Sequence, residues 1–169
     1  VSTGSLYIDD ITLIKTENWK PVKKSEADPK DIAWDHYLSV YAYMNNDKFD
    51  EAIKELDLAL KFDPHLAEAL HWKAVPYRRM FKYDKAIENF QRATEIAPAD
   101  YKYWAELWDE FGETYKRIGK IDEAKKCYKE ILRISFNKPT ILNTVGELYM
   151  GEKKYQEALE YFKKAASFA

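Results

Sequence analysis

Few residues of this 169-residue chain have the types and spacing that catalysis or metal binding requires. The three histidines, His36, His65 and His71, lack the spacing of a metal site and have no companion cysteine pair. Cys127 is the only cysteine, and no histidine lies close to it in the sequence to activate a thiolate. The chain also lacks a glycine-rich phosphate loop and a Gly-x-Ser-x-Gly sequence. We therefore expect no enzyme activity, no metal and no cofactor in this segment.

Aromatic side chains suited to binding recur at three- and four-residue steps near the start of the chain. Trp34, Tyr37 and Tyr41 follow this spacing and so share one face of a helix. Amphipathic aromatic residues are good anchors for apolar or proline-rich peptides. They also fill ordinary helical cores, so both interpretations stay open.

An acidic group follows the same spacing later in the chain. Its members are Glu106, Asp109, Glu110 and Glu113. A stripe of carboxylates favours a basic segment in a protein partner. The alternative is that nearby basic residues neutralise the stripe within the chain; these are Arg78, Arg79, Lys116 and Arg117.

Composition and charge argue against nucleic acid and membranes as partners. The formal net charge is −2 and the lysines are dispersed along the chain, which gives no basic patch for nucleic acid. No apolar run approaches the roughly 20 residues that span a bilayer. We expect a protein or peptide ligand, no nucleic acid and no membrane span.

The elements that position these residues are set by an internal repeat. Tyr43 precedes Ala52 by nine residues, and three later pairs keep this interval. These are Tyr77 and Ala86, Tyr115 and Ala124, and Tyr149 and Ala158. The alanines are spaced by 34, 38 and 34 residues. A period in this range is typical of a helical repeat array, in which one helix pair forms each unit.

The third unit carries the strongest motif. Trp108, Phe111, Gly112 and Tyr115 reproduce the W-x2-L-G-x2-Y spacing with one conservative change, and Ala124 and Tyr128 follow. The fourth unit continues the pattern with Leu142, Val145, Gly146, Tyr149, Ala158 and Phe162. Residues 33–169 therefore resemble tetratricopeptide repeats. The resemblance implies an all-α, right-handed superhelical solenoid of four helix–turn–helix repeats, at about 33–66, 67–100, 101–138 and 139–169.

In this family, the first helix of each pair lines a concave groove. Carried over to this chain, the groove residues are Trp34, Tyr37, Tyr41, His71, Trp72, Arg78, Arg79, Glu106, Asp109, Glu110, Glu113, Asn143 and Glu147. The positions of the family's carboxylate clamp hold Tyr37, Tyr41, Trp72, Glu106 and Glu110, which cannot bind a carboxylate in that way. We therefore expect a non-catalytic interaction scaffold, without a carboxylate clamp, that binds an extended peptide or a partner helix in its groove.

We expect eight helices in a repeat domain over residues 28–169. The expected ranges are 29–45, 48–62, 66–80, 84–97, 100–118, 121–135, 139–151 and 154–168. The 38-residue interval is expected to lengthen the fifth helix by one turn around Tyr101–Trp104 and to place Trp104 and Trp108 on one face. Pro76 lies inside the third helix and predicts a kink, because it removes a backbone donor.

Residues 1–27 have a different composition and are expected to form an extended segment and a polar linker. Residues 1–15 resemble the last strand of a jelly-roll carbohydrate-binding module. That resemblance implies an alternative function, as a spacer or assembly module of a secreted carbohydrate-binding or carbohydrate-processing protein. The compartment stays open between cytoplasm and secretion, and secretion is favoured if the strand belongs to such a module.

The last expected helix ends without a polar capping helix. Leu159, Phe162, Ala165 and Phe168 lie along it. Because repeat arrays need capped ends for solubility, we expect either further repeats or weak self-association through residues 155–169.

Overall fold

The computed structural model describes residues 28–168, and all regular structure in that part of the chain is helical. The helices are α1 (Pro29–Asn45), α2 (Phe49–Phe62), α3 (Ala67–Arg79), α4 (Tyr83–Ile96), α5 (Trp104–Arg117), α6 (Ile121–Ile134), α7 (Pro139–Gly151) and α8 (Tyr155–Ala166). The eight helices were predicted from the sequence. The extended segment and the strand predicted in residues 1–27 lie outside the described residues.

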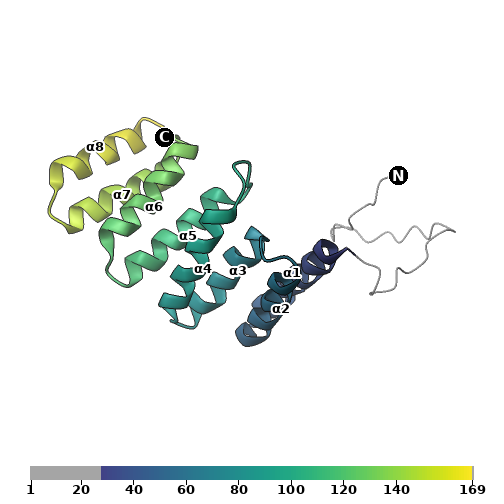
Figure 1. The fold of residues 1–169 in the computed structure, drawn as a ribbon. Helices are drawn as coiled ribbons and strands as arrows, with labels where there is room; N and C mark the ends of the chain where they lie inside the picture. The colour runs from purple at the N-terminus through teal and green to yellow at the C-terminus, as the bar shows by residue number, and fades with distance from the viewer. Residues whose placement is uncertain (1–27, 169) are drawn as a thin grey trace.

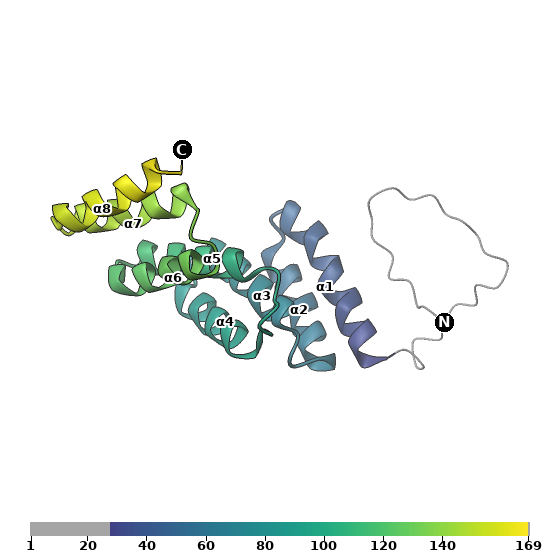
Figure 2. The ribbon, with the colours of Figure 1, turned by 90° about the horizontal axis from the view of Figure 1, so that it is seen from above.

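The helices pack as four successive helix–turn–helix pairs that form a right-handed solenoid. Figure 1 shows the α1–α2 pair at one end of the row and the α7–α8 pair at the other. Seen from above, α1 and α8 again lie at opposite ends of the molecule (Figure 2). Each pair contacts the next, and the first helices of neighbouring pairs also touch, α1 with α3 and α3 with α5. The first helices of the first three pairs therefore share one surface.

The turn inside each pair has the same backbone hydrogen bond. In the first pair the amide of Lys48 donates to the carbonyl of Tyr43 at 2.9 Å. The same 2.9 Å bond joins Lys82 to Tyr77, Lys120 to Tyr115 and Lys154 to Tyr149. The residue before each lysine has a positive φ: Asp47, Phe81, Gly119 and Lys153. This left-handed residue ends the first helix and reverses the chain, which is why the tyrosine and the alanine keep a constant interval.

Small residues bring the two helices of a pair close together, as the repeat pattern predicted. Ala52, Ala86 and Ala124 are fully buried. A Cβ atom on Gly112 would lie 3.0 Å from the Tyr128 ring, and one on Gly146 would lie 2.7 Å from the Phe162 ring. A side chain at either glycine would therefore push the helices apart.

The prediction that the four-residue insertion lengthens the fifth helix is wrong. α5 begins at Trp104, and the inserted residues form tight turns before it, in which the amide of Tyr101 donates to the carbonyl of Pro98 at 3.0 Å. The Trp104 indole also donates to the Pro98 carbonyl at 3.0 Å. These turns carry the Tyr101 ring into the core, where it is 5% exposed. Burial of this ring removes apolar surface from water, which favours these turns.

The positions of two prolines within their helices were expected from the sequence. The Asp28 side chain accepts a hydrogen bond from the Lys30 amide at 2.8 Å, with Pro29 in the first turn of α1. α3 continues through Pro76 to Arg79, so the proline lies within the helix, and the predicted kink stays a prediction.

None of the helices in residues 28–168 is both long and apolar enough to cross a membrane.

Candidate functional site

An apolar hollow opens between the first helices of the first two pairs. Its walls are Tyr37, Leu38, Val40 and Tyr41 of α1 and Trp72 of α3, and its volume is about 190 Å³. We call it the aromatic hollow. The α1 residues share a helix face because they follow at steps of three and four. Tyr41 is 67% exposed and Leu38 48% exposed, so this apolar surface is open to solvent.

Three of the predicted site residues meet in the aromatic hollow, and a fourth lies beside it. Tyr37, Tyr41 and Trp72 line it. The centre of the Trp34 ring lies 4.9 Å from the centre of the Tyr37 ring on the same helix. The indole nitrogen of Trp72 is enclosed and has no hydrogen-bond partner within the described residues. A buried donor without an acceptor costs about 1–3 kcal/mol.

Negative charge surrounds the hollow on the side of α3 and α5. The pKa of Tyr37 is raised well above its ordinary value, first by burial and then by electrostatic interaction with Tyr103, Glu68 and Glu106, of which the two glutamates carry a negative charge at neutral pH. Among the ion pairs of residues 28–168, none involves Glu68 or Glu106. Their carboxylates are therefore available to a cation next to the hollow.

The acidic stripe on α5 is only partly available. Glu110 pairs with Arg78 at 3.4 Å, and Glu113 pairs with Arg117 at 3.2 Å and also with Lys116. Basic residues of the same chain therefore neutralise Glu110 and Glu113, two of the four predicted carboxylates. This internal pairing is the alternative that the sequence left open.

The other two carboxylates of the stripe, Glu106 and Asp109, are exposed. Neighbouring groups displace part of the water around Asp109, and this desolvation, followed by the charges of Glu110 and Glu113, raises its pKa. Arg78 and Lys116 act in the opposite direction, so their charges compensate this carboxylate in part.

The structure places His71 in the core and not on the groove surface. Its side chain is 1% exposed, its Nδ1 lies 3.2 Å from the Tyr101 hydroxyl, and its Nε2 lies 3.5 Å from Glu110. A side chain so enclosed cannot touch a ligand directly. Its place between Tyr101 and Glu110 holds the second and third pairs together.

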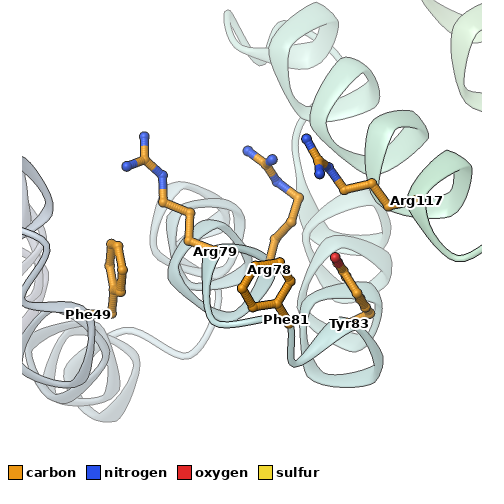
Figure 3. A pocket seen from close by; sticks show the side chains of 6 residues that line it. All are labelled: Phe49, Arg78, Arg79, Phe81, Tyr83 and Arg117. Carbon is orange, nitrogen blue, oxygen red and sulfur yellow. The ribbon is translucent and has the colours of Figure 1, made fainter.

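The remaining predicted residues lie away from the aromatic hollow. Asn143 and Glu147 are exposed on α7, in the pair at the opposite end of the solenoid from α1. Arg78 and Arg79 line a different pocket at the end of α3 (Figure 3).

Arg117 also lines that second pocket, together with three residues that were missed as site residues. The missed residues are Phe49, Phe81 and Tyr83. The signal in the sequence was Phe81, which stands at a turn position where the other pairs hold Asp47, Gly119 and Lys153. Within the described residues, no group of three or more histidine, cysteine and acidic side chains is placed to hold a metal ion.

Fold and geometry together define a helical repeat protein whose first helices share one surface, with the aromatic hollow between α1 and α3. Residues 65–135 match one tetratricopeptide repeat family model, and residues 36–66 and 139–169 match another. The chain belongs to the tetratricopeptide repeat family. The resemblance of residues 1–15 to a carbohydrate-binding module finds no support in these comparisons, whose family matches begin at residue 36.

Curated relatives share this repeat region. The chain is 29% identical over 140 residues to the Hsp70-Hsp90 organising protein of Plasmodium falciparum (isolate 3D7), a match that covers 80% of this chain and 25% of the relative. It is 28% identical over 116 residues to the BBSome complex member BBS4 of Bos taurus, covering 69% and 22% respectively. The chain thus spans about a quarter of the length of these relatives.

Solved structures share the fold. A crystal structure of MamA superposes with a TM-score of 0.73 at 24% identity, over 83% of this chain and 80% of that one. The Cut9-Hcn1 hetero-tetramer of the APC/C matches with a TM-score of 0.65 at 18% identity, over 80% of this chain and 25% of that one. At these identities the likeness concerns the fold alone. With the family established, the chain is a tetratricopeptide repeat scaffold of the protein-interaction class.

Proposed function

We propose that this chain binds an extended peptide segment of a partner protein in the aromatic hollow, without a carboxylate clamp and without catalysis. The observation that carries the proposal is the exposure of Tyr41 and Leu38 around a hollow walled by Tyr37 and Trp72. A volume of about 190 Å³ accommodates one apolar side chain or a proline. Burial of a side chain of that size contributes about 1.5–3 kcal/mol, which is enough for one anchor of a peptide.

The charges beside the hollow specify the next residue of the peptide. Glu68 and Glu106 act on Tyr37 and form none of the ion pairs of residues 28–168, and Asp109 lies on the same helix as Glu106. A lysine or arginine next to the apolar anchor would meet these carboxylates. The ligand class is therefore an apolar residue or proline flanked by a basic residue, in an extended conformation.

Selection from a library of displayed peptides tests this proposal. We expect enriched peptides to contain an apolar residue or proline beside a basic one. Tyr41→Ala should weaken the binding of a selected peptide at least tenfold, and Glu106→Lys should weaken peptides that carry the basic residue. Phe136→Ala is the matched control, since Phe136 is an equally exposed aromatic residue outside the hollow. Equal losses in Tyr41→Ala and Phe136→Ala would exclude the hollow as the site.

Self-association through residues 155–169 stays a separate proposal. Within the described part of this segment, Tyr155, Leu159 and Phe168 are exposed on or beside α8. Apolar residues in such a position support a weak contact between copies. Light scattering over a range of concentrations tests it, and a mass that stays monomeric throughout would exclude it.

A further inference from the structure

A second pocket, at the turn end of the second pair, is lined by three arginines and three aromatic rings. Its residues are Phe49, Arg78, Arg79, Phe81, Tyr83 and Arg117, and its volume is about 270 Å³. We call it the arginine pocket. Figure 3 shows the three guanidinium groups extending to the same side of the pocket, beyond the rings of Phe81 and Tyr83. It is formed by the ends of α3 and α5 and the beginnings of α2 and α4, and so is distinct from the aromatic hollow.

Most of the arginines of this chain line this pocket. The chain contains 27 basic residues, of which only five are arginine, and three of those five line the pocket. Arginine has a planar fork of donors that fits two oxygens of a phosphate or carboxylate at once, which an ammonium group cannot do.

The internal partners of these arginines leave donors unused. Arg78 meets Glu110 at 3.4 Å, and Arg79 meets Asp47 at 3.6 Å, distances longer than a strong charged hydrogen bond. Arg117 uses its Nε toward Glu113 at 3.2 Å. The Nε of Arg78 is enclosed and has no partner within the described residues.

These pairs hold the guanidinium groups in place while most of their N–H groups remain available. With Lys116 also on Glu113, these pairs join four cations to three carboxylates, and Asp109 also acts on Arg78 and Lys116. The lining of the pocket itself contains three guanidinium groups and no carboxylate.

Phe81 forms the apolar wall at a cost to the fold. Its φ of 60° lies in the left-handed region, and its side chain is 74% exposed. The equivalent turns use Asp47, Gly119 and Lys153, and glycine is the residue that adopts this conformation without strain. The ring makes an edge-on contact with Tyr83 and is otherwise largely open to solvent. Such an outlier points to a contact outside the chain.

We propose that the arginine pocket binds a phosphorylated side chain of a partner protein. The phosphate would accept hydrogen bonds from Arg78, Arg79 and Arg117, and an adjacent apolar side chain of the peptide would lie against Phe81. A phosphate group has three acceptor oxygens and close to two negative charges at pH 7, which suits several guanidinium groups better than one carboxylate does. This site is independent of the peptide site proposed above.

The test uses fluorescent degenerate peptides with a fixed central phosphoserine, phosphothreonine or phosphotyrosine, and matched pools with the unphosphorylated residue or glutamate. We expect at least one phosphorylated pool to bind tenfold or more tightly than its unphosphorylated partner. The double variant Arg79→Gln/Arg117→Gln should lose that preference, since both arginines are half exposed and their replacement leaves the core intact. Arg92→Gln/Arg133→Gln, which removes the two arginines outside the pocket, is the matched control and should keep it.

Several outcomes would overturn the proposal. Equal binding of phosphorylated and unphosphorylated pools would exclude phosphate recognition, and equal loss in both double variants would exclude this pocket. Competition by inorganic phosphate at the same concentration as the phosphopeptides would show an adventitious ion site only. Tyr41→Ala, which should leave phosphopeptide binding unchanged, separates this proposal from the one on the aromatic hollow.

Discussion

The Tyr101 hydroxyl lies 3.2 Å from Nδ1 of His71, and this buried contact joins the loop before α5 to the middle of α3. The pair explains how a solenoid with a four-residue insertion keeps its second and third units packed. The insertion forms turns that place the tyrosine in the core, where it gives the buried histidine a partner.

Tyr101→Phe should therefore lower the free energy of unfolding by about 1–3 kcal/mol, because it leaves a buried histidine nitrogen without a partner. Tyr103→Phe, at a half-buried neighbour with no such bond, should change it by less than about 0.5 kcal/mol. Denaturant unfolding of both variants measures the difference. Equal stability of the two variants would show that the contact contributes nothing.

Gly146→Ala should destabilise the last pair, because the new Cβ would lie 2.7 Å from the Phe162 ring. We expect a loss of about 1–3 kcal/mol in the free energy of unfolding. Adding Phe162→Leu should recover part of it. Gly151→Ala is the control: nothing lies within 4 Å of that Cβ, so it should be neutral or slightly stabilising. The account of close helix packing fails if the two alanine variants behave alike.

The buried Lys125 predicts a loss of stability in acid. Its side chain is 7% exposed and donates to Glu152 at 2.7 and 2.8 Å. Hydrogen bonds from Lys125 and Lys154 hold the pKa of Glu152 below its ordinary value. Because the folded pKa is lower than the unfolded one, the stabilisation is complete above the unfolded value of about 4.3 and is lost as pH falls through the folded pKa.

Unfolding of wild type and Glu152→Gln should thus differ at pH 7 and converge as the pH falls below about 4. Glu157→Gln, at an exposed residue that forms none of the ion pairs of residues 28–168, should match wild type at every pH. A difference for Glu152→Gln that persists unchanged in acid would rule out the charge as its cause.

Cys127 should resist thiol reagents in the folded protein. Burial is the main cause that raises the pKa of its thiol to about 12, so the thiolate is scarce at pH 8. Labelling should be slow in native buffer and fast in denaturant. Rapid labelling under native conditions would mean that α6 opens far more readily than its packing indicates.

The repeat pattern was sufficient to predict the helices. In all four pairs the same turn joins the two helices, so the tyrosine before it and the alanine after it keep a constant interval. The pattern could not predict the loop before α5, since a helical extension and a buried tyrosine fit the same four residues. The structure shows the buried tyrosine, whose hydroxyl lies 3.2 Å from Nδ1 of His71 on the neighbouring helix.

The residues of the aromatic hollow were predictable as neighbours where one helix supplies them. Tyr37 and Tyr41 follow from the spacing within α1, and the hollow that they form with Trp72 follows from the neighbouring position of α3. The arginine pocket joins residues from four helices. No periodicity along the chain could assemble it. Of the ion pairs that divide the acidic stripe, only that of Arg78 with Glu110 depends on packing between pairs, because Glu113 pairs with Lys116 and Arg117 of its own helix.

The most direct test of the aromatic hollow is a titration of isotope-labelled protein with a selected peptide, followed by nuclear magnetic resonance. The account predicts that the largest shift changes fall on residues 37–41 of α1 and 68–72 of α3, including the Trp72 indole, and that they disappear in Tyr41→Ala. Changes centred on the outer helices α2 and α4, or on α8, would contradict it.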